Sequence, residues 1–455
     1  MTRSAGAITA ATVAAGVPLR SELVPSVALL GLFDVADYDA LLTARIVERE
    51  LSRRLPLARV DRYAPLGGKR PLALDGGRPA LTLGPPERAR KAELRTRHDL
   101  VVYLGNVLHD RDGLYADLYG VSDVEAERLR PSGFFVDGLG AEPGDRCRVA
   151  WYGVGVPFDL DAAAAERVRT GLASACRVSV RDEDSQRRLL AALGSEVTVT
   201  PHPAVLAARL FPADVLRKRR DYLSTMGWYP TESAPVLVEG GGERAGAAAE
   251  VARTAMELGA PVAVVGLDAS SGQDELADAI TPLLPGPPFR LPAELTLEDV
   301  TAAIAHARAF VGASAAADAV ARAFGVPSKA ATADVVELQE RAGSELDAVA
   351  ALAEDAWAGR AAADGRNVSA LLRALDHAEE RYRALLRAYE QRGERLVEDR
   401  LRYAEIVEGL ETAADGLPAE FVARQSELEN QLEVASAAEA EARLELERAR
   451  AARPG

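Results

Sequence analysis

The run Arg181-Asp182-Glu183-Asp184-Ser185 carries side chains suited to binding an anionic group. Arg181 ends a short apolar stretch, 177–181, and precedes a segment with helical periodicity. A guanidinium at a strand end can bind a phosphate or carboxylate through two nitrogens, while the N–H groups of a following helix add to the field. The alternative is an internal clamp, in which Asp182 caps the helix and pairs with Arg181. The sequence leaves both interpretations open, and Ser185 takes part in either.

Two further carboxylates, Asp34 and Asp37, follow the apolar run 27–32, in a loop that starts near Gly31. Carboxylates accept hydrogen bonds from sugar hydroxyls and bind anions poorly, so these two suit a saccharide ligand. The alternative for Asp37 is a cap on the helix expected from residue 39 onward.

His202 ends another apolar run and precedes a proline, so we consider it a candidate catalytic imidazole, with a structural role as the alternative. His98 and His109 flank the run 100–104 and are further candidate bases, expected on the side of the sheet where a ligand would bind. The histidines are scattered, without cysteines or paired carboxylates at ligand spacing, so we expect no metal.

Glycines mark two other places. Gly153 and Gly155 lie near the end of the strand-like run 149–156 and are expected to shape the wall of a cleft. Gly240 and Gly241 follow the run 236–238 and precede a helical segment, where backbone N–H groups can cradle a phosphate. They lack the Lys-Ser/Thr of a P-loop, and a plain tight turn is the alternative.

Apolar runs alternate with helical segments along most of the chain, the pattern of parallel βαβ units. The alternation restarts after a linker at 229–235. We therefore predict an α/β protein with two Rossmann-like, doubly wound lobes that face a cleft, at residues 23–228 and 229–362. The expected strands are 27–32, 100–104, 149–156, 177–181, 197–200, 236–238, 261–267 and 310–312. The expected helices include 39–55, 205–223, 296–307 and 315–324.

Residues 363–455 form a charged, helical tail, and residues 1–22 form an N-terminal extension. Apolar residues recur at heptad spacing over 371–410, Gly416-Leu417-Pro418 interrupts them, and a second helical pattern covers 419–450. We predict a coiled coil or helical hairpin for self-association or for binding a protein partner. A solvated single helix is the alternative.

Composition excludes several classes of protein. The 455-residue chain has a net charge of −15, which argues against nucleic acid as the main partner. The basic run 217–220 is read as a solvated helix face or a contact between lobes. Cys147 and Cys176 are expected to be free thiols, and no run is long and apolar enough for a membrane span. Because residues 5–18 are also a poor signal peptide, we expect a cytoplasmic protein. The excess of Ala, and of Arg over Lys, indicates a GC-rich, bacterial genome.

Four places resemble the polysaccharide pyruvyl transferase family. The first loop, with Asp34 at an Asn position and Asp37 at the Asp, is similar to its Gly-x-x-Asn-x-Gly-Asp loop. The turn Gly153-Val154-Gly155 resembles its Gly-x-Gly turn, and the block from Arg181 to Ser185 resembles its Arg-Asp-x-x-Ser pattern. The stretch 305–327, ending in Gly-Val-Pro, is similar to its late strand, helix and turn.

This resemblance implies a GT-B-like fold and transfer of a pyruvyl group from phosphoenolpyruvate to a saccharide during synthesis of a bacterial cell-surface glycan such as an exopolysaccharide. Phosphoenolpyruvate would be the donor substrate, a saccharide or lipid-linked glycan the acceptor, and no cofactor is expected. The family's Arg-x-His triplet falls on Ser314 and Ala316 here, which supply neither a charge nor a proton donor. We lean toward an active transferase. The alternatives are a GT-B nucleotide-sugar glycosyltransferase and a degenerate glycan-binding or scaffold protein.

Overall fold

The computed structural model describes residues 24–67, 74, 79–109, 119, 121–140, 146–240, 248–267, 273–328, 334–363 and 380. Residues 25–55 and 60–360 belong to one compact unit, which holds two parallel sheets. The predicted extension at 1–22 and, apart from residues 363 and 380, the predicted coiled-coil tail lie outside the described residues.

The first sheet has seven strands in the order β3-β2-β1-β4-β5-β6-β7, and the pairings with a defined register are parallel. Its central strands are short runs of Val, Leu and Ala with buried side chains, as expected for a sheet covered on both faces. The strands are β1 (Ser26–Leu30), β2 (Arg59–Ala64), β3 (Leu81–Thr82), β4 (Leu100–Tyr103), β5 (Arg148–Val154), β6 (Arg177–Val180) and β7 (Thr198–Val199). The predicted α/β class with a parallel sheet is confirmed.

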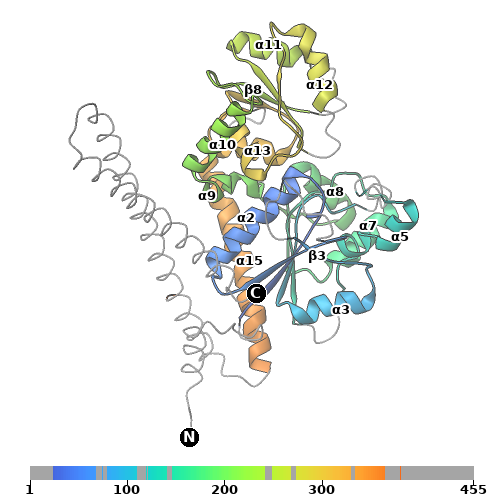
Figure 1. The fold of residues 1–455 in the computed structure, drawn as a ribbon. Helices are drawn as coiled ribbons and strands as arrows, with labels where there is room; N and C mark the ends of the chain where they lie inside the picture. The colour runs from blue at the N-terminus through green and yellow to red at the C-terminus, as the bar shows by residue number, and fades with distance from the viewer. Residues whose placement is uncertain are drawn as a thin grey trace, which may run out of the picture. The chain divides into compact units, whose positions relative to one another are not determined.

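Helices α3, α6, α7 and α8 contribute side chains to the core on one face of this sheet, and Figure 1 shows α2 on the opposite side. Aspartates cap three of the helices in this lobe: Asp37 on α2, Asp161 on α7 and Asp182 on α8. The helices are α2 (Tyr38–Arg54), α3 (Arg88–Arg97), α5 (Asp123–Leu129), α6 (Ser132–Phe135), α7 (Ala162–Leu172) and α8 (Glu183–Leu193).

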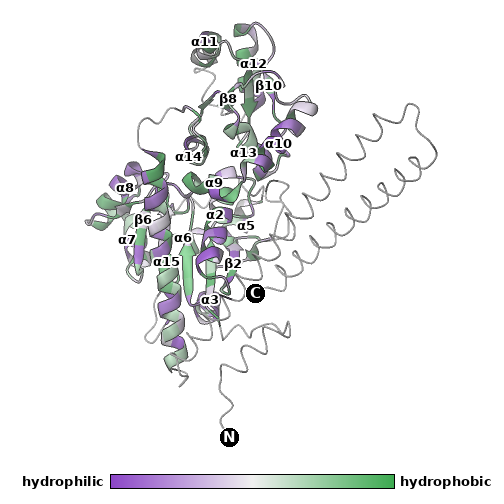
Figure 2. Ribbon diagram, turned by 90° about the vertical axis from the view of Figure 1, so that its left-hand side faces the viewer, coloured by the Kyte–Doolittle hydropathy of each residue, from purple (hydrophilic) through white to green (hydrophobic). Residues whose placement is uncertain are grey.

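The single helix predicted at 205–223 is wrong. The segment consists of a 3₁₀ turn, η3 (Pro203–Leu206), followed by α9 (Ala207–Leu210) and α10 (Ala213–Thr225). Pro212 separates α9 from α10, because proline has no N–H for a helix interior and holds the preceding Phe211 in an extended conformation. The basic run lies on α10, which Figure 2 shows as largely hydrophilic; within that run, Arg219 approaches Asp299 of the second lobe at 3.7 Å.

The second sheet has four parallel strands in the order β10-β9-β8-β11. The helix predicted from Thr296 is confirmed, with a capping box between Thr296 and Asp299. The strands are β8 (Val236–Glu239), β9 (Val262–Val265), β10 (Phe289–Arg290) and β11 (Ala309–Val311). The helical segments are α11 (Ala248–Leu258), α12 (Gln273–Ile280), η5 (Thr281–Leu283), α13 (Leu297–Ala305) and α14 (Ala315–Ala323).

Helix α15 (Val335–Ala363) returns to the first sheet, although its residues fall in the range predicted for the second lobe. Glu345 accepts hydrogen bonds from Nε and Nη2 of Arg177 in β6, each at 2.7 Å. The hydroxyl of Tyr152 in β5 donates to the Ala342 carbonyl at 3.3 Å. These contacts attach helix α15 to β5 and β6 of the first sheet.

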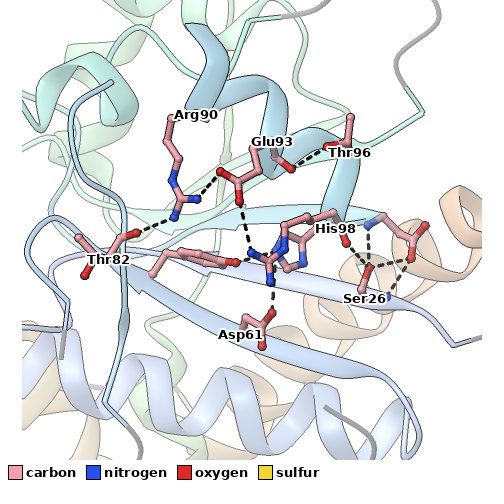
Figure 3. Close-up of polar contacts among 10 residues, drawn as sticks. Ser26, Asp61, Thr82, Arg90, Glu93, Thr96 and His98 are labelled. Atoms are coloured by element: carbon pink, nitrogen blue, oxygen red, sulfur yellow. Dashed lines mark hydrogen bonds and ion pairs between the residues drawn. The ribbon is translucent and has the colours of Figure 1, made fainter. Parts of the chain in front are cut away.

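At the amino ends of β1 and β4, Asp99 is buried and accepts hydrogen bonds from the backbone and hydroxyl of Ser26 (Figure 3). His98 is buried beside it, with Nε2 3.0 Å from the Tyr63 hydroxyl. Because ligands of such sheets bind at the carboxyl ends of the strands, the prediction that His98 lies on the ligand side is wrong. His98 precedes β4, and its place is structural.

Candidate functional site

The strand order of the first sheet reverses direction between β1 and β4. In doubly wound sheets, ligands bind beyond the carboxyl ends of the strands at this reversal. The segments that follow five adjacent strands bring polar residues to this edge, and we take them as the candidate site. These residues are Asp34, Asp37 and Asp39 after β1, Asn106 after β4, Gly153 and Gly155 in and after β5, Arg181 after β6, and Thr200 and His202 after β7.

Asp39, in the first turn of α2, connects two of the predicted site residues. Its Oδ2 accepts a hydrogen bond from Arg181 Nη1 at 2.9 Å, and its Oδ1 lies 2.9 Å from His202 Nε2. The Thr43 hydroxyl, one turn further along α2, also donates to Oδ1. The ends of β6 and β7 are therefore tied to the helix that follows β1.

The clamp proposed as one reading of the Arg181–Ser185 block is present. Asp182 Oδ1 accepts from the backbone N–H of Ser185 at 2.6 Å and so caps α8, while Oδ2 accepts from Arg181 Nε at 3.2 Å. The buried Ser185 hydroxyl accepts from the backbone N–H of Val156 at 3.0 Å. The spacing of the residues in this block therefore has a local structural cause, and ligand binding by Asp182 and Ser185 stays a prediction.

His202 has both ring nitrogens engaged. Nδ1 accepts a hydrogen bond from the backbone N–H of Ala204 at 3.1 Å, so Nδ1 carries no proton. Nε2 must then carry the ring proton and donate it to Asp39. The chain itself thus engages both ring nitrogens of His202, and acid–base catalysis by this ring would require Asp39 or Ala204 to move away. Its catalytic role stays a prediction.

Both carboxylates beside Arg181 remain ionised. Burial opposes the charge on Asp39, but the neighbouring His202, the Arg181 guanidinium and the Thr43 hydroxyl lower the pKa of this carboxyl below its usual range. Burial likewise opposes ionisation of Asp182, and hydrogen bonds from Ser185 together with Arg181 lower its pKa. One guanidinium thus faces two carboxylates, so this part of the edge has no excess positive charge to hold a phosphate.

The carboxylates of Asp34 and Asp37 both accept hydrogen bonds from other groups of the chain. Asp34 is buried and accepts from the backbone N–H groups of Leu66 and Gly67 and from the Tyr119 hydroxyl, at 2.6, 2.9 and 2.8 Å. Burial nevertheless raises the pKa of Asp34 above its usual value, against these three hydrogen bonds. The side chain of Asp37 accepts from the backbone N–H of Ala40 at 3.1 Å, as the capping alternative predicted. Their contact with a saccharide stays a prediction.

The predicted glycines allow close approach of neighbouring groups. Gly153 has φ of +56°, a left-handed conformation that favours glycine. A Cβ on Gly155 would lie 1.9 Å from Asn106 Oδ1 and 2.9 Å from Arg181 Nε, so only glycine leaves room there. At Gly31 a Cβ would lie 2.5 Å from the Phe33 ring.

In the second sheet, Glu239 ends β8 and reaches the start of α14. Its Oε2 accepts from the backbone N–H groups of Ala313 and Ser314, at 2.6 and 2.8 Å. The Ser314 hydroxyl caps α14 by accepting from Ala317 N–H. The N–H of Gly240 donates to the Val265 carbonyl at 2.8 Å, while Gly241 lies outside the described residues. These N–H groups are occupied by the chain's own oxygens, so phosphate binding by Gly240, Gly241 and Ser314 stays a prediction.

Asp39, Asn106 and Glu239 were not predicted as site residues. A signal existed for Asp39, which lies two residues after Asp37 at the start of the expected helix. Asn106 follows the run 100–104 directly, which places it at a strand end. Among the described residues, no group of three or more His, Cys, Asp and Glu side chains is arranged to hold a metal ion. No helix in the described part of the chain combines the length and apolar character needed to cross a membrane.

Residues 140–315 match the sequence model of the polysaccharide pyruvyl transferase family, so this part of the chain is similar to that family. None of the curated protein sequences matches the chain. Among solved structures, ADP-heptose LPS heptosyltransferase II of E. coli is 14% identical, with 72% of this chain and 98% of that chain covered and a TM-score of 0.34. UDP-GlcNAc 2-epimerase from Neisseria meningitidis is 12% identical, with 77% and 100% covered and a TM-score of 0.39. At these TM-scores, the similarities add nothing to the architecture that the strand order shows.

Proposed function

From the match of residues 140–315 to the polysaccharide pyruvyl transferase family, we propose that this chain is a transferase of glycan assembly that moves a pyruvyl group from phosphoenolpyruvate to a saccharide. The family match is the observation that carries the proposal. It spans β5, the Arg181–Ser185 block and the start of α14, and therefore includes parts of both sheets. The matched region also contains Gly153, Gly155 and His202.

The carboxyl edge of the first sheet supports the acceptor half of this proposal. Asp39 and Asp182 neutralise Arg181, and carboxylates favour hydroxyl-bearing ligands over anions. We assign the saccharide acceptor to this edge. The donor would then be held across from it, in a GT-B-like arrangement of the two lobes.

The donor half of the proposal has less support. Binding of phosphoenolpyruvate calls for cations at its phosphate and carboxylate and for a proton donor at the enol carbon. Ser314 and Ala316 replace the family's Arg-x-His, and the carboxylate of Glu239 faces the backbone N–H of Ser314. This favours, as a second candidate, a protein of the same fold that binds a glycan without turnover. We place either activity in the cytoplasm during exopolysaccharide synthesis, with self-association through residues 371–450.

Phosphate release tests the proposal. The purified chain is incubated with phosphoenolpyruvate and saccharide acceptors, and inorganic phosphate and the pyruvylated product are measured. We expect release that depends on the acceptor and that falls at least tenfold in Arg181→Ala. Arg187→Ala is the control, since Arg187 is an exposed arginine on α8 paired with the exposed Asp184. An absence of phosphate release with every acceptor, together with saccharide binding, would support the second candidate instead.

A further inference from the structure

Asn106 lies in the segment that follows β4, beside the reversal of strand order in the first sheet. Its Oδ1 atom is buried and has no hydrogen-bond partner in the structure, although the residue as a whole is partly exposed. A buried amide oxygen without a partner is unfavourable, and in folded proteins most such oxygens are bonded to the protein, to water or to a ligand. Thr200, after β7, shows the same feature at the same edge, with an unpartnered hydroxyl and a side chain only 1% exposed.

The position of Asn106 depends on Gly155. Its Oδ1 lies within 2 Å of the place that a Cβ on Gly155 would take, and Arg181 Nε lies within 3 Å of that same place. The glycine thus brings an amide and a guanidinium together at the ends of β4, β5 and β6. Rotation about χ2 of asparagine is soft, so either amide atom can turn toward a ligand without movement of the backbone.

The surrounding charges select the kind of ligand. Arg181 donates through Nε to Asp182 and through Nη1 to Asp39, so its charge is already balanced by two carboxylates. His202 is held between Asp39 and the backbone N–H of Ala204, so its ring nitrogens are already engaged. An anion would meet two carboxylates here, whereas a hydroxyl can donate to the amide oxygen and accept from the amide N–H.

We propose that the side-chain amide of Asn106 binds a hydroxyl group of a neutral saccharide, with Gly155 keeping the space in which it does so. This rests on the proposed function only for the assignment of the acceptor to this edge. The proposal names Asn106 as a residue that recognises the acceptor. It also specifies that the part of the sugar bound by Asn106 is uncharged.

Saturation-transfer NMR on the full chain tests this without requiring turnover. The probes are glucose, galactose, mannose and N-acetylglucosamine, with phosphoenolpyruvate as an anionic probe. We expect at least one neutral sugar to bind and its Kd to rise about tenfold in Asn106→Ala, the effect of losing one hydrogen bond to a buried group. Gly155→Ala should reproduce the loss by displacing Asn106.

Thr96→Ala is the control, because Thr96 ends α3 and lies at the amino end of β4, on the opposite edge. Urea unfolding of Asn106→Ala should show no loss of stability, since Oδ1 makes no internal hydrogen bond that the change would remove. The inference is overturned if no neutral sugar binds the wild type, if sugar binding survives both variants, or if Asn106→Ala unfolds more easily in proportion to its loss of binding. Binding that depends on Asn106 without any phosphate release would leave this inference standing and refute pyruvyl transfer.

Discussion

Asp39 Oδ2 lies 2.9 Å from Arg181 Nη1, and this ion pair joins residues that are 142 positions apart in the chain. One member follows the first strand of the sheet and the other follows the sixth. The pair positions the guanidinium and at the same time removes its excess charge. Its strength therefore bears on both the stability and the ligand preference of the site.

Replacement of Asp39 by Asn should destabilise the protein by about 2 kcal/mol at pH 7, because a partly buried guanidinium loses its charged partner. The folded state lowers the pKa of Asp39 below its usual 3.8, so the contribution of this carboxylate to stability is complete above about pH 5 and is lost as the pH falls further. Urea unfolding of the wild type and of Asp39→Asn should give a difference in the free energy of unfolding that is constant from pH 7 to pH 5 and shrinks in more acidic buffer. A difference that grows in acid would contradict the ion pair.

The tautomer of His202 follows from its two hydrogen bonds. Nitrogen-15 NMR of labelled protein at neutral pH should show a protonated Nε2 and an unprotonated Nδ1 for this ring, because Nδ1 accepts from Ala204. In Ala204→Pro, which removes the donor, both tautomers become possible. A proton on Nδ1 in the wild type would exclude the arrangement.

Ser185→Ala should cost about 1.5 kcal/mol in the free energy of unfolding, because the buried N–H of Val156 loses its acceptor. Ser195→Ala, at an exposed serine after α8, should change it by less than about 0.5 kcal/mol. Thermal unfolding of the two variants gives the comparison. Equal effects would show that the hydrogen bond from Val156 contributes little.

Arg360→Ala should destabilise the chain by about 3 kcal/mol, because Asp99, whose side chain is 2% exposed, loses its charged partner on α15. Burial raises the pKa of Asp99, and the charge of Arg360 is the largest effect that lowers it. Loss of Arg360 should therefore raise the pKa of Asp99 further. The deficit should shrink as the pH falls and Asp99 takes up a proton. The control is Arg290→Ala, which breaks exposed pairs with Asp274 and Asp278 and should cost less than about 0.5 kcal/mol.

Glu239→Ala should weaken the start of α14 by about 1 kcal/mol, since two backbone N–H groups lose a charged acceptor at a helix N-terminus. Glu239→Gln, which keeps an acceptor without the charge, should have a smaller effect. The rates of amide hydrogen exchange at Ala313 and Ser314 measure the loss of these two hydrogen bonds directly. Unaltered exchange at both amides in the alanine variant would contradict the contact.

Local features of the fold were predictable from the sequence. The apolar runs 27–32 and 100–104 became β1 and β4, because fully buried parallel strands need continuous apolar side chains. The alternating stretch 177–181 became β6, whose last two residues are buried. The caps at Asp37, Asp182 and Thr296 were also predictable, since a cap is a contact between residues three positions apart. Helix α15 was missed because its place depends on partners in the first lobe, such as Arg177 and Asp99.

The sequence by itself determined the α/β class, the restart of the βαβ pattern after residue 235, and the block from Arg181 to Ser185. These depend on hydrophobic periodicity and on capping, which act over a few residues. Only the tertiary structure decided that Asp39 neutralises Arg181, that His202 is held between Asp39 and Ala204, and that Asn106 lies against Gly155. The physical reason is that charge balance and burial at the site come from the ends of five strands, brought together by the parallel sheet from segments that are far apart in the chain.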